Sequence, residues 1–237
     1  MNYNTDTFKR ELEKLEISIS EEQLEQFIRY YEMLIEKNKV MNLTAITDFD
    51  EVIEKHFIDS LNLFRFEDLK ADKTIIDMGT GAGFPGIPLK IAFPNLKITL
   101  ADSLNKRILF LNDVISELGL TDIDTVHGRA EDLAKDKTYR ENYDICVSRA
   151  VANLSTLSEY CLPFVKIGGQ FISYKSGDCD EEITNAKSAI FLLGGRLNQI
   201  QKFEINDNSR SFVIIDKVNG TSKQYPRKAG LPSKKPL

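Results

Sequence analysis

The segment that most constrains the fold is a glycine-rich stretch, Gly79-Thr80-Gly81-Ala82-Gly83, which directly follows a short apolar run at residues 74–78. Glycine lets a chain turn sharply and lets its backbone approach a ligand closely, at an entropic cost that a plain turn need not carry. A strand, a glycine loop and a helix in this order are typical of an α/β protein with a parallel sheet. We therefore expect a ligand at this loop rather than a plain turn.

The chain after residue 74 alternates short apolar runs with helical stretches, the clearest of which covers residues 104–118 and ends before Gly119. The last two apolar runs are separated only by a short polar turn, which can join antiparallel strands but not parallel ones. We predict a doubly wound α/β sheet of seven strands in which the last pair contains one antiparallel strand. The expected strands are residues 74–78, 97–101, 123–127, 143–148, 169–175, 197–205 and 211–216, with a helix at 180–193.

The first seventy residues read as helices. Ser20 and Gln23 form a capping box, and apolar residues then recur every three or four positions in a helix that ends near Asn38. A second helix is expected over residues 48–63. The predicted division is an N-terminal helical extension at 1–70, a catalytic domain at 71–217 and a basic tail at 218–237. We expect the N-terminal helices to cap the carboxyl edge of the sheet as an appendage.

The composition is that of an ordinary globular protein: 237 residues, 42% hydrophobic, with 31 Lys and Arg against 36 Asp and Glu for a net charge of −5. This mild acidity disfavours nucleic-acid binding by bulk charge, so any such site must be a local patch. The three cysteines form no CxxC pair, which disfavours zinc or a disulfide framework. No apolar run reaches the roughly 20 residues of a membrane helix, and the N-terminus has no signal-peptide pattern. A cytoplasmic protein without metal or membrane contact is expected.

Two ligands compete for the glycine loop. Residues 81–86 fit the GxGxxG pattern of dinucleotide sites, whereas Gly79, Gly81 and Gly83, with Asp77 two residues before them, fit the loop of S-adenosylmethionine (SAM)-dependent methyltransferases. SAM has no pyrophosphate and is cationic at its sulfonium and ammonium groups, so an acid at the strand end suits SAM better. Asp102, at the end of the next strand, can accept hydrogen bonds from the ribose hydroxyls of either cofactor, or can cap a helix.

Other strand ends carry further candidates. Glu131 follows the third strand and could accept from the adenine amine, or simply favour a helix N-terminus. Arg149, after the fourth strand, could hold a carboxylate, a phosphate or substrate backbone, or form a surface ion pair, and Lys175 after the fifth strand has the same choice. The histidines, His56 and His127, give no nucleophile–base pair, so a hydrolase has little support.

The C-terminal segment from Lys217 has six basic residues and no acidic one. It could be a solvated, frayed terminus. Alternatively its cations neutralise nucleic-acid phosphates while Tyr225 stacks on an unpaired base. From the cations at strand ends and in the tail, the predicted RNA-binding residues are Lys175, Arg227, Lys228, Lys234 and Lys235.

Taken in order, several sequence blocks make a resemblance specific. The chain resembles, over nearly its whole length, the bacterial 16S ribosomal RNA (guanine-N7) methyltransferase G family, also called glucose-inhibited division protein B. The mild departure is Ala101, where a larger β-branched residue is more usual. The blocks are Met41-Asn42-Leu43-Thr44-Ala45-Ile46, His56-Phe57-Ile58-Asp59-Ser60-Leu61, the glycine loop with its continuation Phe84-Pro85-Gly86-Ile87-Pro88, Asp102-Ser103-Leu104-Asn105-Lys106-Arg107, Gly128-Arg129-Ala130-Glu131-Asp132, Ser148-Arg149-Ala150-Val151-Ala152 and Tyr225-Pro226-Arg227-Lys228-Ala229-Gly230.

The resemblance implies a class I SAM-dependent methyltransferase fold and a monomer that methylates N7 of one guanine (position 527 in standard rRNA numbering) in the decoding region of 16S rRNA, free or in the small ribosomal subunit. Guanine N7 has a lone pair and no proton, so no general base is needed and no catalytic residue is assigned, with Arg149 the one candidate for such a role. Together with the glycine loop, the implied cofactor-binding residues are Gly79, Gly81, Gly83, Phe84, Asp102, Ser103, Ala130, Glu131 and Arg149.

Two rival functions stay open. An NAD-dependent oxidoreductase is disfavoured by the acid before the glycines, by the missing substrate domain and by the closing antiparallel pair. A non-catalytic RNA-binding ribosome-assembly protein that retains the fold would share the basic tail, and only a test of methyl transfer separates it from the enzyme.

Overall fold

A single seven-stranded sheet organises the chain, in a computed structural model that describes residues 3–149 and 152–237. The strand order is β3-β2-β1-β4-β5-β7-β6; β7 runs antiparallel to both of its neighbours, β5 and β6, and the other neighbouring strands pair in parallel. The predicted doubly wound sheet with one antiparallel strand is confirmed. The order reverses between β1 and β4, which is where ligands bind in such sheets. The strands are β1 Thr74–Met78, β2 Lys97–Asp102, β3 Ile123–His127, β4 Tyr143–Arg149, β5 Val165–Ser176, β6 Gly195–Ile205 and β7 Asn208–Lys217.

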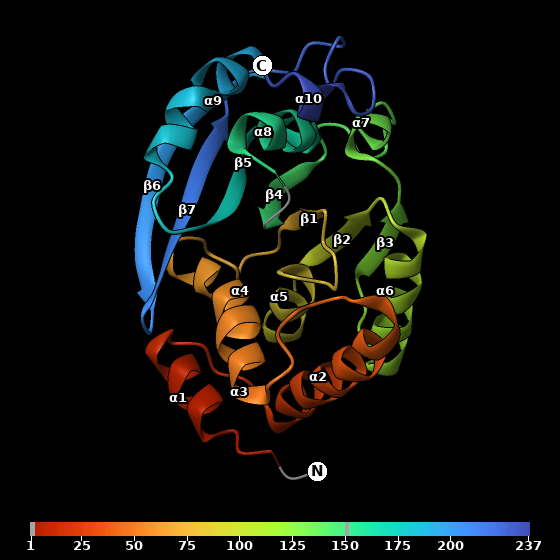
Figure 1. The fold of residues 1–237 in the computed structure, drawn as a ribbon, viewed down its shortest axis with the longest axis vertical. Coiled ribbons are helices and arrows are strands. Elements are labelled where there is room, and N and C mark those ends of the chain that lie inside the picture. Colours follow the sequence, from red (N-terminus) through yellow and green to blue (C-terminus); the bar gives the residue numbers. More distant parts are fainter. Residues whose placement is uncertain (1–2, 150–151) are drawn as a thin grey trace.

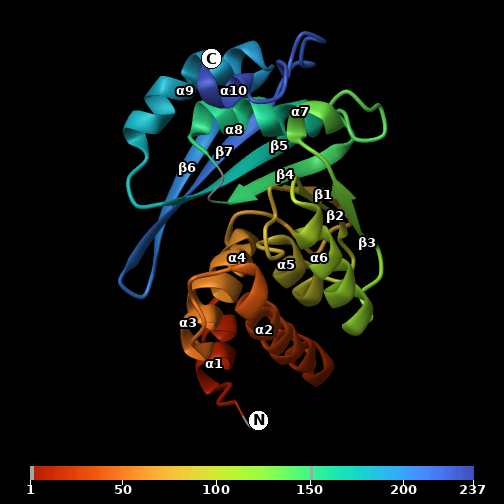
Figure 2. The ribbon, with the colours of Figure 1, turned by 45° about the vertical axis from the view of Figure 1, so that its right-hand side comes forward.

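Helices cover both faces of the sheet, and each face buries its own hydrophobic core (Figures 1 and 2). One layer contains α5 (Gly86–Ala92), α6 (Asn105–Glu117) and the N-terminal helices α1 (Asp6–Lys14) and α2 (Glu21–Met41). The other layer contains α7 (Ala130–Leu133), α8 (Leu154–Cys161) with a 3-10 turn at Leu162–Phe164, α9 (Asp180–Leu192) and α10 (Leu231–Lys234).

The capping box at the start of α2 is present as predicted: the Ser20 hydroxyl accepts from the Gln23 amide at 3.1 Å, and the Gln23 side chain accepts from the Ser20 amide at 2.7 Å. The second predicted helix is a continuous run of four segments. They are α3 (Phe49–Val52), a π-helical segment η1 (Ile53–Ile58), α4 (Asp59–Leu61) and a 3-10 segment η2 (Asn62–Arg65). π-Helical turns are rare in proteins, and those that occur are often at functional sites. The η1 segment therefore makes His56, which lies within it, a candidate site residue.

The N-terminal helices do not cap the carboxyl edge of the sheet as expected but pack on one of its faces. The Tyr30 hydroxyl of α2 donates to the Ala82 carbonyl at 2.6 Å. The side-chain amide of Gln26 donates to the carbonyl of Leu118, the residue that follows α6, at 2.8 Å. The physical reason is the apolar stripe of α2, which needs a partner and packs against α5 and α6, while α1 packs against η1. Of the described residues of the extension, those that line the cavities at the edge come from the α2–α3 connection, η1 and the start of α4.

The C-terminal tail is ordered over its described length rather than frayed. The Arg140 guanidinium donates to the carbonyls of Thr221 and Tyr225 at 2.7 and 3.0 Å, and the Thr156 hydroxyl of α8 donates to the Pro232 carbonyl at 3.2 Å. The tail is therefore part of the α8 layer. Among the described residues, no helix combines the length and apolar character that crossing a membrane requires.

Candidate functional site

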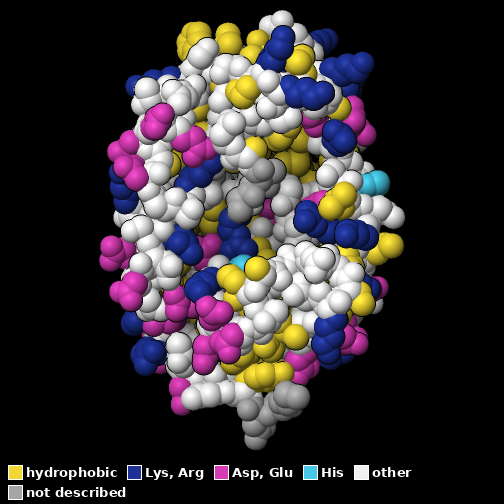
Figure 3. All heavy atoms as spheres, in the orientation of Figure 1, with side chains coloured by type: hydrophobic (Ala, Val, Ile, Leu, Met, Phe, Trp, Pro, Cys, Tyr) yellow, Lys and Arg dark blue, Asp and Glu magenta, His cyan; other side chains and the backbone are white. Residues whose placement is uncertain are grey.

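Two adjoining cavities lie at the carboxyl edge of the sheet and share Arg149 and His56 in their walls. The first, of about 380 Å³, lies over the ends of β1 and β2, and we call it the β1–β2 cavity. The second, of about 530 Å³, lies over the ends of β4, β5 and the start of β7, and we call it the β4–β7 cavity. They form the hollow at the centre of the face in Figure 3, between the two helical layers of Figure 1.

The glycines of the loop after β1 serve two purposes. A Cβ added at Gly81, whose φ is +64°, would meet nothing nearer than 4.0 Å, so this position opens into the β1–β2 cavity. A Cβ at Gly83 would lie 2.6 Å from the Ile87 side chain and 2.8 Å from the Tyr30 hydroxyl. Gly79 and Gly81 therefore line the cavity, whereas Gly83 permits close packing beneath the loop.

Asp77 fastens this loop from below and is 0% exposed. One carboxylate oxygen accepts from the Thr80 hydroxyl at 2.7 Å and from the Gly86 amide at 2.8 Å. The other oxygen has no hydrogen-bond partner among the described residues. Burial raises the pKa of Asp77 to about 6. Asp77 lines neither cavity, so the structure gives it a role in holding the loop and not a direct contact with a ligand.

Asp102, at the end of β2, lines the β1–β2 cavity together with Ser103. Its carboxylate accepts from the Gly81 amide at 3.0 Å, from the Leu104 amide at 2.9 Å and from the Arg107 guanidinium at 3.1 Å. Both expectations for this residue are compatible with the geometry, because it orders the start of α6 and also presents an acceptor to the cavity.

Arg149, at the end of β4, lies between the two cavities. Its guanidinium donates to Asp59 at 2.9 Å and to the Lys55 carbonyl at 3.3 Å, and lies 5.0 Å from the centre of the Phe84 ring. The His56 ring stacks on Phe84 at 4.6 Å between centroids. Burial, and then the nearby Arg149 charge, lower the pKa of His56 to about 4, so this imidazole is neutral at pH 7. Phe84 and Arg149 both line the β1–β2 cavity.

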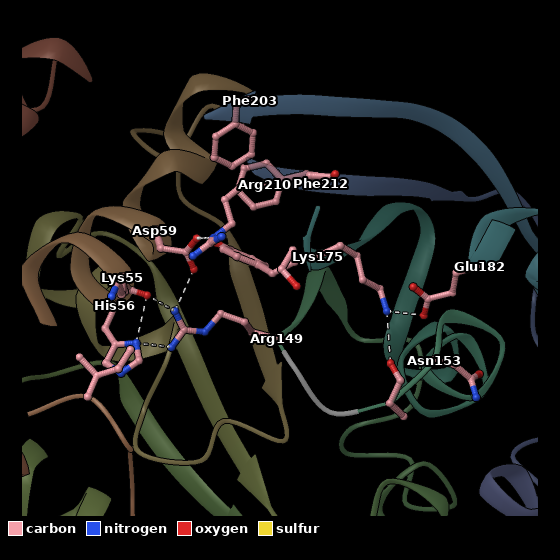
Figure 4. Close-up of a pocket in the computed structure, with 15 residues that line it drawn as sticks. Lys55, His56, Asp59, Arg149, Asn153, Lys175, Glu182, Phe203, Arg210 and Phe212 are labelled. Atoms are coloured by element: carbon pink, nitrogen blue, oxygen red, sulfur yellow. Dashed lines mark hydrogen bonds and ion pairs between the residues drawn. The ribbon is translucent and has the colours of Figure 1, made fainter. Parts of the chain in front are cut away.

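The β4–β7 cavity has charged groups on two walls, as Figure 4 shows. On one wall Asp59 bridges two arginines, accepting from Arg149 and, at 2.8 Å, from Arg210. On the other wall Lys175 donates to Glu182 at 2.6 Å. Sequence reasoning singled out Lys175 and Arg149 but missed the rest. Asp59 lay inside a recognised sequence block, whereas Arg210 and Glu182 have no local motif and reach the cavity only through the fold.

The remaining predicted residues lie outside the two cavities. Ala130 and Glu131, at the start of α7, are buried, and Glu131 accepts from the Gly230 amide of the tail at 2.8 Å. Arg227 is ion-paired at 2.6 Å with Glu159, whose side chain is 0% exposed. Three predicted RNA-binding lysines are exposed at the surface: Lys228, Lys234 and Lys235.

Part of one recognised block, Ala150 and Val151, falls outside the described residues. Within the described part of the chain, no group of three or more His, Cys, Asp or Glu side chains is arranged to hold a metal ion.

Comparison with known proteins places this geometry in context. The family model described as "rRNA small subunit methyltransferase G" (GidB) matches residues 23–213. The chain is 51% identical over 227 residues to the Ribosomal RNA small subunit methyltransferase G of Clostridium novyi, which covers 95% of this chain and 93% of that protein. It is 53% identical over 233 residues to the protein of that name in Lachnoclostridium phytofermentans, covering 98% and 96%.

Solved structures share the fold at low sequence identity. A SAM-dependent methyltransferase from Aquifex aeolicus aligns with a TM-score of 0.54 at 17% identity, over 73% of this chain and 96% of that one. The M. jannaschii TYW2 protein in complex with AdoMet aligns with a TM-score of 0.51 at 14% identity, over 62% and 70%. The class I methyltransferase fold implied by the resemblance is therefore confirmed.

Proposed function

Since the chain belongs to the rRNA small subunit methyltransferase G family, we propose that it transfers the methyl group of SAM to N7 of a guanine in the RNA of the small ribosomal subunit. The observation that supports this most is the pair of adjoining cavities that share Arg149 and His56. The β1–β2 cavity has the groups for an adenosine-type cofactor. The β4–β7 cavity gives the target guanine access to the methyl group of that cofactor.

The β1–β2 cavity suits SAM. Asp102 and Ser103 would hold the ribose hydroxyls, the backbone at Gly79 and the open position at Gly81 would admit the cofactor, and Phe84 would contact its apolar parts. SAM supplies a methyl group made electrophilic by its sulfonium. Asp77 is not among the residues that line the cavity, and its role is to hold the loop through Thr80 and Gly86. Ala130 and Glu131 stay proposed cofactor contacts by family resemblance, at the point where the tail meets α7.

The chain's own residues have an orienting task in this reaction. Guanine N7 attacks with a lone pair and releases no proton, so no base is needed. The charged groups near Arg149 are already paired, and His56 is neutral. Holding the two reactants in line can supply about 7–11 kcal/mol of the barrier. We propose that Arg149 positions Asp59 and Phe84 at the boundary of the two cavities. The target guanine has to leave its base stack to reach the β4–β7 cavity.

For RNA binding we propose Lys175 in the β4–β7 cavity and the exposed lysines Lys228, Lys234 and Lys235. Arg227 has its charge neutralised by a buried carboxylate, and this favours a role in docking the tail over direct phosphate contact. We further propose a monomer that acts in the cytoplasm, where its rRNA substrate would be, on position 527 of 16S rRNA. Sedimentation tests the oligomeric state.

Methyl transfer from labelled SAM tests the proposed function. The substrates are 16S rRNA and small subunits from cells lacking this gene, and the product is treated with borohydride and aniline, which cleave at N7-methylguanine. One enzyme-dependent break at position 527 is the expected result. Methyl incorporation without a break would place the methyl on another atom. SAM binding without incorporation into any substrate would favour the non-catalytic RNA-binding alternative.

The cofactor assignment has its own test. Asp102→Asn removes a charged acceptor from the cavity and should weaken SAM binding about tenfold or more, since hydrogen bonds to charged groups contribute about 1.5–3 kcal/mol. Asp113→Asn, on an exposed part of α6, is the matched control. Equal SAM affinity in the Asp102 variant and the parent would refute the ribose assignment.

A further inference from the structure

The wall of the β4–β7 cavity opposite Arg149 carries a donor and an acceptor side by side (Figure 4). Lys175 Nζ lies 2.6 Å from Glu182 Oε1 and also donates to the Ala152 carbonyl at 3.2 Å. The Lys175 side chain is 11% exposed and that of Glu182 is 28% exposed. Both therefore line the cavity without being free on the outer surface.

Among the described residues, only one carboxylate oxygen of Glu182 takes part in hydrogen bonds. Its Oε1 accepts from the Leu154 amide at the start of α8 and from Lys175. Its Oε2 has no hydrogen bond with the described residues. The first turn of α8 already has a capping residue, because Asn153 accepts from the Thr156 amide at 3.0 Å. Oε2 therefore remains available as an acceptor on a residue that lines the cavity.

The Watson–Crick edge of guanine has hydrogen-bonding groups that are complementary to Lys175 and Glu182. Guanine presents an acceptor at O6, then a donor at N1–H, then a donor at the 2-amino group. If N7 points toward Arg149 and the β1–β2 cavity, this edge turns toward the other walls. A lysine beside a two-oxygen carboxylate is its complement. Adenine presents a donor at position 6, an acceptor at N1 and nothing at C2, and would place its N1 lone pair against a carboxylate.

We propose that Lys175 and Glu182 determine the specificity for guanine, with Lys175 donating to O6 and Glu182 accepting from N1–H and the 2-amino group. The half-buried Phe203 offers a ring for the base to stack on, above a floor that contains the buried Tyr174 and Phe212. This inference rests on the proposed function, because it requires a guanine in the β4–β7 cavity.

The test measures methyl-transfer rates on small subunits assembled from 16S rRNA that carries guanine, inosine or 2-aminopurine at the target position. Inosine lacks the 2-amino group, and 2-aminopurine lacks O6 and N1–H. The parent protein should prefer guanine over inosine by about tenfold, the worth of one hydrogen bond to a charged group. Glu182→Gln should lower the rate on guanine and reduce the guanine-to-inosine ratio to about one or two. Lys175→Met should lower the rate on guanine at least tenfold and the rate on 2-aminopurine much less.

Glu181→Gln is the matched control, since Glu181 is the exposed neighbour of Glu182 on α9. SAM affinity and thermal unfolding show whether each variant is folded. A purely structural ion pair would lower the rates on guanine and inosine by the same factor, and that unchanged ratio would overturn the proposal. If the parent made no N7-methylguanine even on the guanine substrate, the proposed function itself would fail, whatever the variants did.

Discussion

At Gly81 and Gly83 the backbone φ angles are +64° and +106°, yet their surroundings differ. Alanine at Gly81 pays the left-handed backbone cost of about 1–2 kcal/mol but places its Cβ in open space. Alanine at Gly83 adds a clash with Ile87 and Tyr30, for about 1–3 kcal/mol more. We expect Gly81→Ala to weaken SAM binding with a small loss of stability, and Gly83→Ala mainly to lower the free energy of unfolding. SAM titration and denaturant unfolding of both variants check this, and normal SAM affinity in Gly81→Ala would contradict it.

The buried Asp77 carboxyl should make the free energy of unfolding depend on pH. Burial raises the pKa of Asp77 from 3.8 to about 6, so the folded protein binds more protons than the unfolded chain between these values. The free energy of unfolding therefore falls as the pH rises from about 4, and this loss is complete once the pH has passed 6. Asp77→Asn removes this loss. The free energy of unfolding of Asp77→Asn relative to the parent should therefore rise by up to about 3 kcal/mol between pH 4 and pH 7.

The experiment is chemical unfolding without cofactor at a series of pH values, with Asp113→Asn as the exposed control. His56 contributes with the opposite sign: its pKa is lowered to about 4 from 6.5, so its stability contribution is present above 6.5 and is lost as pH falls through 4. That contribution is common to the parent and the Asp77 variant, so it cancels in their difference. A difference that stays constant across pH would contradict the burial of the Asp77 charge.

At the scale of elements, the tail contains two adjacent cations in different settings. Arg227→Ala leaves Glu159 buried without a cation, and breaking a buried pair in this way costs about 3–5 kcal/mol. We expect this variant to lose stability and to expose the tail to proteolysis. Lys228→Ala, at an exposed position, should change stability by less than about 0.5 kcal/mol and weaken RNA binding. Replacing Glu159 by Leu together with Arg227 by Met should restore much of the stability. Equal effects of Arg227→Ala and Lys228→Ala on stability would refute the docking role.

How much of the fold could be read in advance also differs by element. The five parallel strands, the closing hairpin and the capping box of α2 follow from local patterns, and these predictions are confirmed. The π-helical segment around His56 could not be predicted, because its sequence is that of an ordinary amphipathic helix. The position of the N-terminal helices depends on which sheet face is left uncovered, which no local pattern records. Glu182 and Arg210 reach the β4–β7 cavity from α9 and β7 for the same non-local reason.

For the whole molecule, the expected division at residue 70 crosses one hydrophobic core. Phe57 is 1% exposed, and its ring packs near Tyr30 of α2 and Phe84 of the ligand loop, at 5.6 and 6.2 Å between centroids. We infer that residues 1–70 and the sheet fold as one unit. Phe57→Ala should then lower the free energy of unfolding by about 3–5 kcal/mol while leaving a single transition. Separate transitions for an N-terminal unit and the sheet, seen by two probes, would favour an independent extension.

The charge of the whole molecule sets the last prediction. With a net charge of −5, the protein is repelled by RNA as a whole, so binding must come from local cations. Each phosphate contact to a single strand contributes about −0.7 to the slope of log affinity against log salt. Replacing Lys228, Lys234 and Lys235 together by Ala should therefore flatten this slope by up to about 2. The same charge change in α1, at Lys9, Arg10 and Lys14, lies far from α10 (Figure 1) and should leave the slope unchanged. The measurement is 16S rRNA binding at several salt concentrations. An equal effect of both triple variants would mean that bulk charge governs binding, whereas an effect confined to the tail variant would locate the RNA-binding surface on the C-terminal tail.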